Sequence, residues 1–225
     1  MHLPVRLARW WSGGPERVSM LDGYERWAPV YPAHPHNPLM EAEAGVVSAL
    51  IRSTAPRQAL DVGTGTGRNR ATLREAGASF VTGVDLSASM LRHGGAACPR
   101  VRGDARQLPF ATGSFDVVTS SLMCGDVPDL GGWLGEAARV LAPGGHLIYS
   151  DFHPSWTVAG WRRTFRSDDG REYELPFFPH TIEAHLEQLA SHGLEVRAIR
   201  EPRVAARRHA VVVVLHATRP SHRGR

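Results

Sequence analysis

A short apolar run that enters a glycine-rich turn constrains the fold of this chain more than any other feature. Residues 58–62 read Gln-Ala-Leu-Asp-Val, and residues 63–67 read Gly-Thr-Gly-Thr-Gly. An apolar run of this length is typical of a buried strand, and good helix formers follow from Arg68 to Glu75. The strand, turn and helix together predict the corner of a parallel sheet at which a nucleotide-like ligand binds.

Strands and helices alternate through much of the remaining sequence. Further strands are expected at residues 79–85, 100–103, 115–119, 146–152, 195–199 and 209–217, and helices at residues 39–53, 88–93, 130–141 and 181–191. The rhythm breaks only after residue 152, for about thirty residues. Alternation of this kind predicts a parallel sheet with helices packed on both faces.

Length and composition narrow the class of protein. The 225 residues suit one domain with a full core. No apolar run reaches the ~20 residues that cross a bilayer, and the first residues lack a secretory signal, so we expect a cytoplasmic protein with no membrane partner. Met1 and Met20 both remain possible starts. The two cysteines, Cys98 and Cys124, indicate no disulfide framework, and the twelve histidines show no ligand spacing, so no metal site is expected.

The positive charge of the chain raises the question of nucleic acid. The formal net charge is +4, and every basic residue is arginine. These arginines are scattered, with a modest excess over residues 197–208, and no nucleic-acid-binding motif accompanies them. We therefore favour a solvated surface over a phosphate-binding patch, and no nucleic-acid partner is expected.

The glycine turn departs from the dinucleotide-binding pattern G-x-G-x-x-G, which would need glycine where Arg68 stands. Residues 61–67 instead read Asp-Val-Gly-Thr-Gly-Thr-Gly, which resembles the first motif of class I S-adenosylmethionine-dependent methyltransferases. Further segments follow in that family's order. They are Val-Thr-Gly-Val-Asp-Leu-Ser at residues 81–87, Arg-Gly-Asp-Ala-Arg-Gln-Leu-Pro-Phe at residues 102–110, Ser-Phe-Asp-Val-Val at residues 114–118, and Arg-Val-Leu-Ala-Pro-Gly-Gly-His-Leu at residues 139–147. The resemblance covers residues 59–152 and is greatest to the small-molecule branch that includes ubiquinone/menaquinone and malonyl-carrier-protein methyltransferases.

The resemblance implies a complete architecture. The expected fold is α/β, a Rossmann-like, seven-stranded, mostly parallel sheet with helices on both faces and an antiparallel last strand. The single methyltransferase domain would then divide into four parts. These are an N-terminal lid or cap (residues 1–55), a cofactor-binding half (56–152), an inserted lid (153–180) and the C-terminal half of the sheet (181–218).

The resemblance also implies S-adenosyl-L-methionine as cofactor and assigns residues to it. Asp85 would accept both ribose hydroxyls, Leu86 would lie against the adenine, and Asp104 would accept a hydrogen bond from the adenine amino group. Tyr24, in a segment similar to the branch's lid, would close over the methionine end. The remaining implied cofactor residues are Asp61, Gly63, Gly65, Gly67, Met90, Ala105 and Ser120. Taken alone, Asp85 also suits a helix cap, Asp104 a turn and Tyr24 plain packing.

Two residues near the expected ends of the fourth and fifth strands are candidate general bases, Asp126 and His153. A histidine titrates near neutrality, although a loop histidine bonded to a carbonyl is the alternative for His153. The Trp- and Phe-rich segment 152–178 predicts an apolar roof over a small acceptor, one that we expect to be aromatic and of secondary-metabolic biosynthesis. The Pro-Cys and N-P-P-Y motifs of enzymes that methylate bases or protein amides are absent.

Two other functions stay open at this point. A catalytically silent S-adenosylmethionine-binding subunit would activate a partner, although such proteins usually lose glycines that this chain keeps. A nicotinamide-dependent oxidoreductase would share the first strand, turn and helix, but a chain without lysine cannot carry the Tyr-x-x-x-Lys motif of short-chain reductases. The methylated atom (O, N or C), the need for a base and the oligomeric state are left open.

Overall fold

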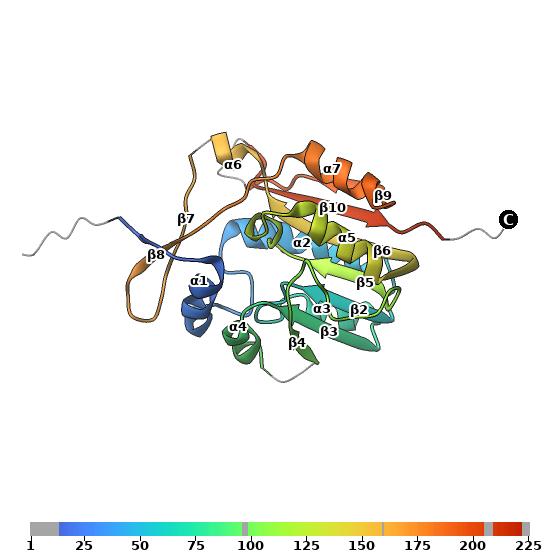
Figure 1. Ribbon diagram of the computed structural model, residues 1–225, viewed down its shortest axis with the longest axis horizontal. Helices are drawn as coiled ribbons and strands as arrows, with labels where there is room; N and C mark the ends of the chain where they lie inside the picture. The colour runs from blue at the N-terminus through green and yellow to red at the C-terminus, as the bar shows by residue number, and fades with distance from the viewer. Residues whose placement is uncertain (1–13, 96–98, 159, 205–208, 222–225) are drawn as a thin grey trace, which may run out of the picture.

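The computed structural model describes residues 14–95, 99–158, 160–204 and 209–221, and its centre is a seven-stranded sheet (Figure 1). The strands are ordered β4-β3-β2-β5-β6-β10-β9. Their bounds are β2 (Gln58–Val62), β3 (Phe80–Asp85), β4 (Arg100–Arg102), β5 (Phe115–Ser120), β6 (Leu141–Phe152), β9 (Glu195–Arg200) and β10 (Val212–Thr218). β4, β3, β2, β5 and β6 are parallel, whereas β10 is antiparallel to both β6 and β9. The expected fold class is confirmed, including the reversed last strand.

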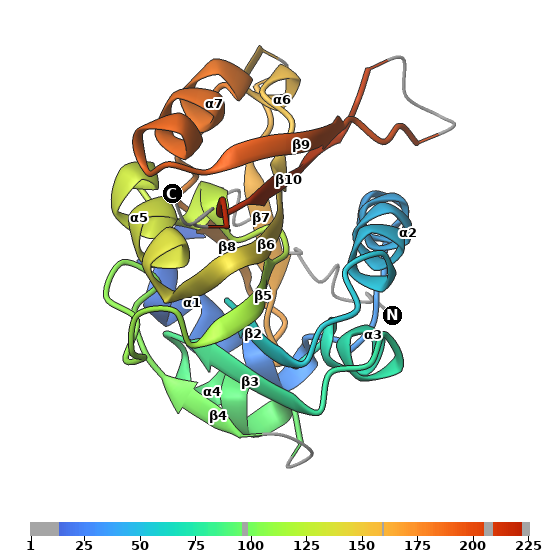
Figure 2. The same ribbon diagram turned by 90° about the vertical axis from the view of Figure 1, so that its right-hand side faces the viewer.

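Helices cover both faces of this sheet because its central strands are apolar on both sides. The helices are α1 (Met20–Trp27), α2 (Pro38–Arg52), α3 (Arg70–Glu75), α4 (Ala88–His93), α5 (Leu130–Val140), α6 (Ser155–Val158) and α7 (Ile182–Ser191), with 3₁₀ turns η1 (Ala28–Val30) and η2 (Cys124–Asp126). α5 and α7 lie on one face, and α2 and α3 lie on the other (Figure 2).

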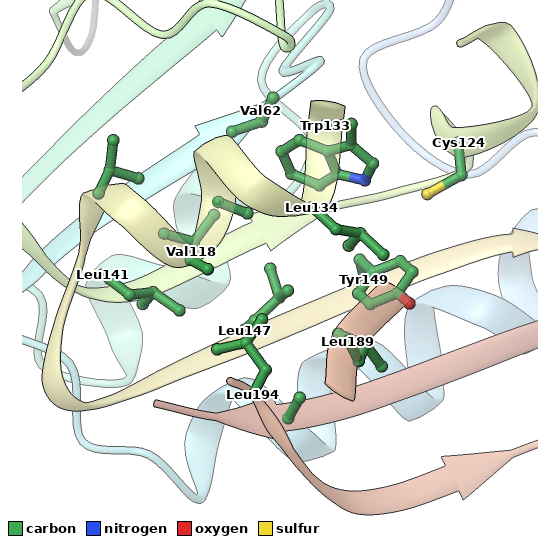
Figure 3. Close-up of a cluster of buried hydrophobic side chains, with 14 of the residues drawn as sticks. Val62, Val118, Cys124, Trp133, Leu134, Leu141, Leu147, Tyr149, Leu189 and Leu194 are labelled. Atoms are coloured by element: carbon green, nitrogen blue, oxygen red, sulfur yellow. The ribbon is translucent and has the colours of Figure 1, made fainter. Parts of the chain in front are cut away.

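The larger core lies beneath α5 and α7. Trp133 and Leu134 of α5 pack against Leu147 and Tyr149 of β6, and Leu189 of α7 closes the cluster (Figure 3). All five side chains are fully buried. A second core joins α2 and α3 to the opposite face of β6 and β10. The sheet is therefore held rigid from both sides, and the loops at its carboxyl edge are free to form a site.

Local signals in the sequence place two of the helix starts. Asn37 caps α2 by accepting a hydrogen bond from the Met40 amide, and Pro38 occupies the first turn. Ser87 caps α4 in the same way by accepting from the Met90 amide. The second cap ends the β3–α4 connection within two residues, which brings the carboxyl end of β3 close to the start of α4.

A second, three-stranded sheet of order β1-β8-β7 was not expected from the sequence. It contains β1 (Glu16–Arg17), β7 (Arg163–Arg166) and β8 (Glu172–Leu175). Phe165 and Tyr173 of the β7–β8 hairpin are buried, and Trp27 of α1 stacks on Phe165 with ring centroids 4.8 Å apart. The N-terminal segment and the insert thus form one layer, and we call β1, α1, β7 and β8 the lid layer.

Three expected bounds need correction. β6 begins at Leu141 rather than at residue 146, because Leu141 already pairs with Phe115 and the Pro-Gly-Gly segment makes an irregularity within the strand. β10 begins at Val212 rather than at residue 209. α3 begins at Arg70, since the glycine turn continues through Asn69. In the part of the chain that the structure describes, no helix combines the length and apolarity that a bilayer crossing requires.

Candidate active site

A cavity of about 640 Å³ opens at the carboxyl edge of the large sheet, where the lid layer lies over it. The ends of β2, β3, β5 and β6 contribute its floor, and α1 and β7 contribute its roof. Ten residues that the sequence assigned to the site line it: Tyr24, Asp61, Gly63, Gly65, Asp85, Leu86, Met90, Asp104, Ala105 and Asp126. The fold thus gathers at one place residues that are spread over a hundred positions of the chain.

Asp61 anchors the glycine turn from inside. Its carboxylate accepts hydrogen bonds from Thr64 Oγ1 at 2.7 Å, Thr119 Oγ1 at 2.7 Å and Asn69 Nδ2 at 3.0 Å. Burial raises the pKa of Asp61, while these three donors oppose that change. A carboxylate with this many protein partners shapes the turn more than it offers oxygen atoms to a ligand.

The glycine turn exposes main-chain atoms to the cavity, because Gly63 and Gly65 carry no side chains. Gly63 has φ +64°, and a Cβ there would approach Met123 Cγ to 2.7 Å. Gly65 has φ +52°, and a Cβ there would meet no atom within 4 Å, because this glycine faces the open cavity. Both glycines are required by conformation, and Gly65 also allows a ligand to approach the main chain.

Asp85 stands at the end of β3 beside this turn. Its Oδ2 accepts from the Gly65 amide at 2.8 Å, and its Oδ1 accepts from the Ser87 amide at 2.9 Å. Burial raises the pKa of Asp85, and the two amides oppose that change. The next residue, Leu86, lines the cavity and is 43% exposed, so an apolar surface lies directly beside the carboxylate.

Asp104 and Ala105 follow β4 on the same wall of the cavity. The Asp104 carboxylate accepts from Arg106 Nε at 3.0 Å and from Arg106 Nη2 at 2.6 Å. Hydrogen bonding from Arg106 holds the pKa of Asp104 below its ordinary value. Met90 completes this wall and is 1% exposed.

A buried polar cluster forms the other end of the cavity. Tyr24 of α1 donates its hydroxyl to Asp126 Oδ2 at 2.7 Å, and Arg163 of β7 pairs with Asp126 and donates to the Tyr24 oxygen. The Asp126 and Arg163 side chains are only 9% and 8% exposed. Burial raises the pKa of Tyr24 to about 12, although Arg163 opposes that change, so the phenol stays protonated and keeps its proton for Asp126.

Three residues assigned from the sequence do not line the cavity. Gly67, with φ +88°, closes the turn against Arg70. Ser120 is fully buried within β5. His153 does not face the cavity as expected, because side chains alternate along the end of β6 and Phe152 occupies the inward position. The His153 ring is held by Ser155 Oγ and by Glu201 Oε1, each 2.9 Å away.

The sequence reading missed several cavity residues, of which Arg163 is the most prominent. The sequence does contain a pattern that predicts the hairpin carrying Arg163. Asp169-Gly170 is a typical hairpin turn, and the residues on either side of it alternate between polar and apolar. Aromatic side chains from two stretches of the chain, residues 27–31 and 152–161, also line this end of the cavity. They are Trp27, Tyr31, Phe152, Trp156 and Trp161.

A Rossmann-like sheet with this strand order, a reversed last strand and a glycine turn facing a cavity defines the fold of class I S-adenosylmethionine-dependent methyltransferases. Residues 60–149 match the family model described as a methyltransferase domain. The expected resemblance to these methyltransferases is therefore confirmed over this part of the chain, and the nicotinamide-dependent alternative is not supported.

Individual known proteins resemble different parts of the chain. The demethylmenaquinone methyltransferase of Tropheryma whipplei (strain Twist) is 38% identical over 122 residues, which is 52% of this chain and 51% of that protein. The chain thus spans about half the length of the curated relatives it matches. An S-adenosylmethionine-dependent methyltransferase from Mesorhizobium loti shares the fold with a TM-score of 0.65 and 24% identity, covering 79% of this chain and 98% of that one. The DhpI–SAH complex matches with a TM-score of 0.68 and 23% identity over 91% of this chain and 96% of that one.

Proposed function

We propose that this protein is an S-adenosylmethionine-dependent methyltransferase that acts on a neutral, aromatic small molecule bearing a hydroxyl group. One observation carries the proposal: the glycine turn, the carboxylate that ends β3 and the Asp126–Arg163 pair all face one cavity. The volume of about 640 Å³ is in the range of pockets that hold a small molecule.

The residues at the first end of the cavity fit the cofactor. Gly65 leaves open space where a side chain would stand, and Asp85 offers carboxylate oxygens beside the apolar Leu86. Asp85 would hold the ribose hydroxyls, Leu86 and Met90 would contact the adenine, and Asp104 with Ala105 would bind the adenine edge. When bound, S-adenosylmethionine supplies a methyl group on a sulfonium, which is already a strong donor.

The residues at the other end fit an aromatic acceptor. Trp27, Tyr31, Phe152, Trp156 and Trp161 all line the cavity, so a planar apolar ring would find aromatic surfaces there. The charges lining this end are balanced, because Arg163 pairs with Asp126. A balanced wall favours a neutral acceptor over an acid or an amine.

Asp126 would orient the acceptor. Its carboxylate is fixed by Tyr24 and Arg163 and reaches the cavity, so it can accept the hydrogen bond of an acceptor hydroxyl and aim the oxygen toward the methyl group. The same carboxylate can take the proton that the hydroxyl loses on methylation. With the acceptor bound, the aromatic walls would exclude water from this end. The reaction is then carried by alignment, with Asp126 as the polar contact.

The test is methyl transfer from isotopically labelled S-adenosylmethionine to a panel of neutral phenols, matched carboxylic acids and matched amines. Mass spectrometry should find label on the oxygen of phenols. Asp126→Asn should lower kcat by about 10–100-fold, because a hydrogen bond to a charged group is lost. His153→Ala should change kcat by less than about threefold, since its ring lies outside the cavity.

Three outcomes would contradict this proposal in different ways. Binding of S-adenosylhomocysteine without transfer to any phenol, acid or amine would support the catalytically silent subunit instead. Transfer to amines alone would refute the hydroxyl-bearing acceptor. A large loss of kcat in His153→Ala with none in Asp126→Asn would return the base to the position that the sequence first indicated.

A further inference from the structure

Leu122 has a backbone conformation that leucine rarely adopts. Its φ is +57°, in the left-handed region that favours glycine, and its side chain lines the cavity just beyond the end of β5. Such a conformation persists only where the surrounding structure holds it. The next residue, Met123, lies against Gly63 of the glycine turn. The backbone conformation of Leu122 therefore determines where the Leu122 and Met123 side chains lie relative to the glycine turn.

A buried serine on the neighbouring strand holds Leu122 in place. The Leu122 amide donates to Ser150 Oγ at 2.9 Å, and Ser150 lies fully buried in β6. Ser150 in turn donates its hydroxyl proton to Glu43 Oε1 at 2.7 Å. Glu43 thus orients the Ser150 hydroxyl. Because the hydroxyl proton points to Glu43, the lone pairs of Ser150 Oγ face the Leu122 amide.

Glu43 of α2 is a fully buried carboxylate that the proposed reaction does not use. Its second oxygen lies 3.2 Å from Arg68 Nη1. Arg68 follows the glycine turn, lines the cavity and has a side chain only 14% exposed. A carboxylate is buried at this depth only when charged and hydrogen-bonding partners compensate it, and here Arg68 and Ser150 do so.

These contacts form one polar chain from Leu122 through Ser150 and Glu43 to Arg68. We propose that Ser150 and Glu43 are positioning residues that shape the cofactor end of the cavity by holding Leu122 left-handed and Arg68 against the wall. The inference rests on the proposed function, because it takes S-adenosylhomocysteine as the ligand of that end. Neither Ser150 nor Glu43 lines the cavity.

A double-mutant cycle on S-adenosylhomocysteine affinity, measured by calorimetry, tests the link to Leu122. Ser150→Ala should weaken binding about tenfold, because the Leu122 amide loses its acceptor. In a Leu122→Gly background the same substitution should weaken binding by less than about twofold, since glycine adopts this φ without strain. Hydrogen exchange at the Leu122 amide should speed up in Ser150→Ala. Ser48→Ala, the same change on α2 outside the cavity, should alter neither quantity.

The glutamate is tested by two variants of different severity. Glu43→Gln keeps an acceptor for Ser150, whereas Glu43→Ala removes the partner of both Ser150 and Arg68, so the alanine variant should lose more affinity. Should Ser150→Ala fail to fold, Ser150→Cys keeps the size of the side chain with a weaker acceptor, and the same cycle applies.

An equal loss from Ser150→Ala in both backgrounds, or no loss in either, would overturn the positioning role. Equal losses in Glu43→Gln and Glu43→Ala would overturn the hydrogen-bonded link through Ser150. A wild-type protein that does not bind S-adenosylhomocysteine would instead refute the proposed function, while exchange at the Leu122 amide would still report on the contact with Ser150.

Discussion

At the scale of single residues, Asp85 has the strongest claim to ligand contact. It lines the cavity, and its two carboxylate oxygens accept hydrogen bonds from the backbone amides of Gly65 and Ser87. We expect Asp85→Ala to weaken S-adenosylhomocysteine binding by about 1–3 kcal/mol, the cost of losing hydrogen bonds to a charged group. Calorimetry measures this, with the exposed Asp168→Ala as the control. Unchanged affinity in Asp85→Ala would remove Asp85 from the ligand site.

A pair of histidines on β6 and β10 leads us to predict how the free energy of unfolding depends on pH. His146 Nδ1 lies 2.9 Å from His216 Nε2, across the β6–β10 pairing. Burial, then His146 and Arg197, lower the pKa of His216 to about 4. An unfolded histidine titrates near 6.5, so the unfolded chain binds more protons between these values. Stability is therefore full above about pH 6.5 and falls as the pH drops toward about 4.

Urea unfolding of the wild type and of His216→Gln at about pH 5 and about pH 7.5 measures this effect. The wild type should lose more of its free energy of unfolding between the two pH values than the variant does, because the variant lacks the buried imidazole. An identical loss in both proteins would assign the acid sensitivity to other groups. The carboxylates near the cavity titrate equally in both proteins and so cancel in the comparison.

Some site residues could be predicted from the sequence and others could not. Asp85 and Asp126 could be placed in the cavity because strand ends in a parallel sheet meet at one edge. His153 could not be excluded, since one residue along a strand reverses the side that a side chain faces, and the end of β6 was uncertain by more than that. Arg68 was noted only as a departure from the dinucleotide pattern, although it lines the cavity.

At the scale of elements, the large sheet was predictable and the lid layer was not. The seven strands follow from buried apolar runs at regular spacing, each supported by its neighbours. β1 and β8 are short, and their pairing joins residues 16–17 to residues 173–174, a contact between distant segments that no local pattern announces. The expectation of a lid at both segments stays a prediction, but their common sheet gives it a physical form.

The lid layer makes polar contacts with the start of α4 near the cavity. Glu25 of α1 accepts from Ser87 Oγ at 2.9 Å and from the Ser89 amide at 3.2 Å, beside the Tyr24–Asp126–Arg163 cluster. Polar contacts of this kind open at low cost in free energy. The layer's own apolar contacts, including Trp27 on Phe165, hold α1 and the hairpin together.

We therefore predict that α1 and the β7–β8 hairpin are protected together when ligand binds. Hydrogen exchange of backbone amides in both segments should slow in parallel on addition of S-adenosylhomocysteine, because the ligand bridges the lid layer and the sheet. β5 and β10, which are almost entirely buried and pair with a strand on each side, serve as internal controls and should change little. Equal protection with and without ligand would contradict a moving lid layer, and protection of one segment alone would contradict a single layer.

At the scale of the whole molecule, the large sheet and the lid layer together line one cavity. Residues 56–152 supply the glycine turn, Asp85 and the end of β6, β10 pairs with β6, and the lid layer adds Tyr24 and Arg163. The family model covers the cofactor half, from residue 60 to residue 149. Aromatic residues that line the cavity lie outside that match, among them Trp27, Tyr31, Phe152, Trp156 and Trp161. The proposed function therefore predicts that these segments set the acceptor specificity.

Calorimetric titration of the wild-type protein with S-adenosylhomocysteine, alongside an identical titration with NADP, tests the central claim most directly. We predict one molecule of S-adenosylhomocysteine per chain with a micromolar Kd, and no heat from NADP, because Arg68 stands where the dinucleotide pattern needs its third glycine. Binding of NADP with no binding of S-adenosylhomocysteine would contradict the assignment of the cavity and, with it, the proposed methyltransferase activity.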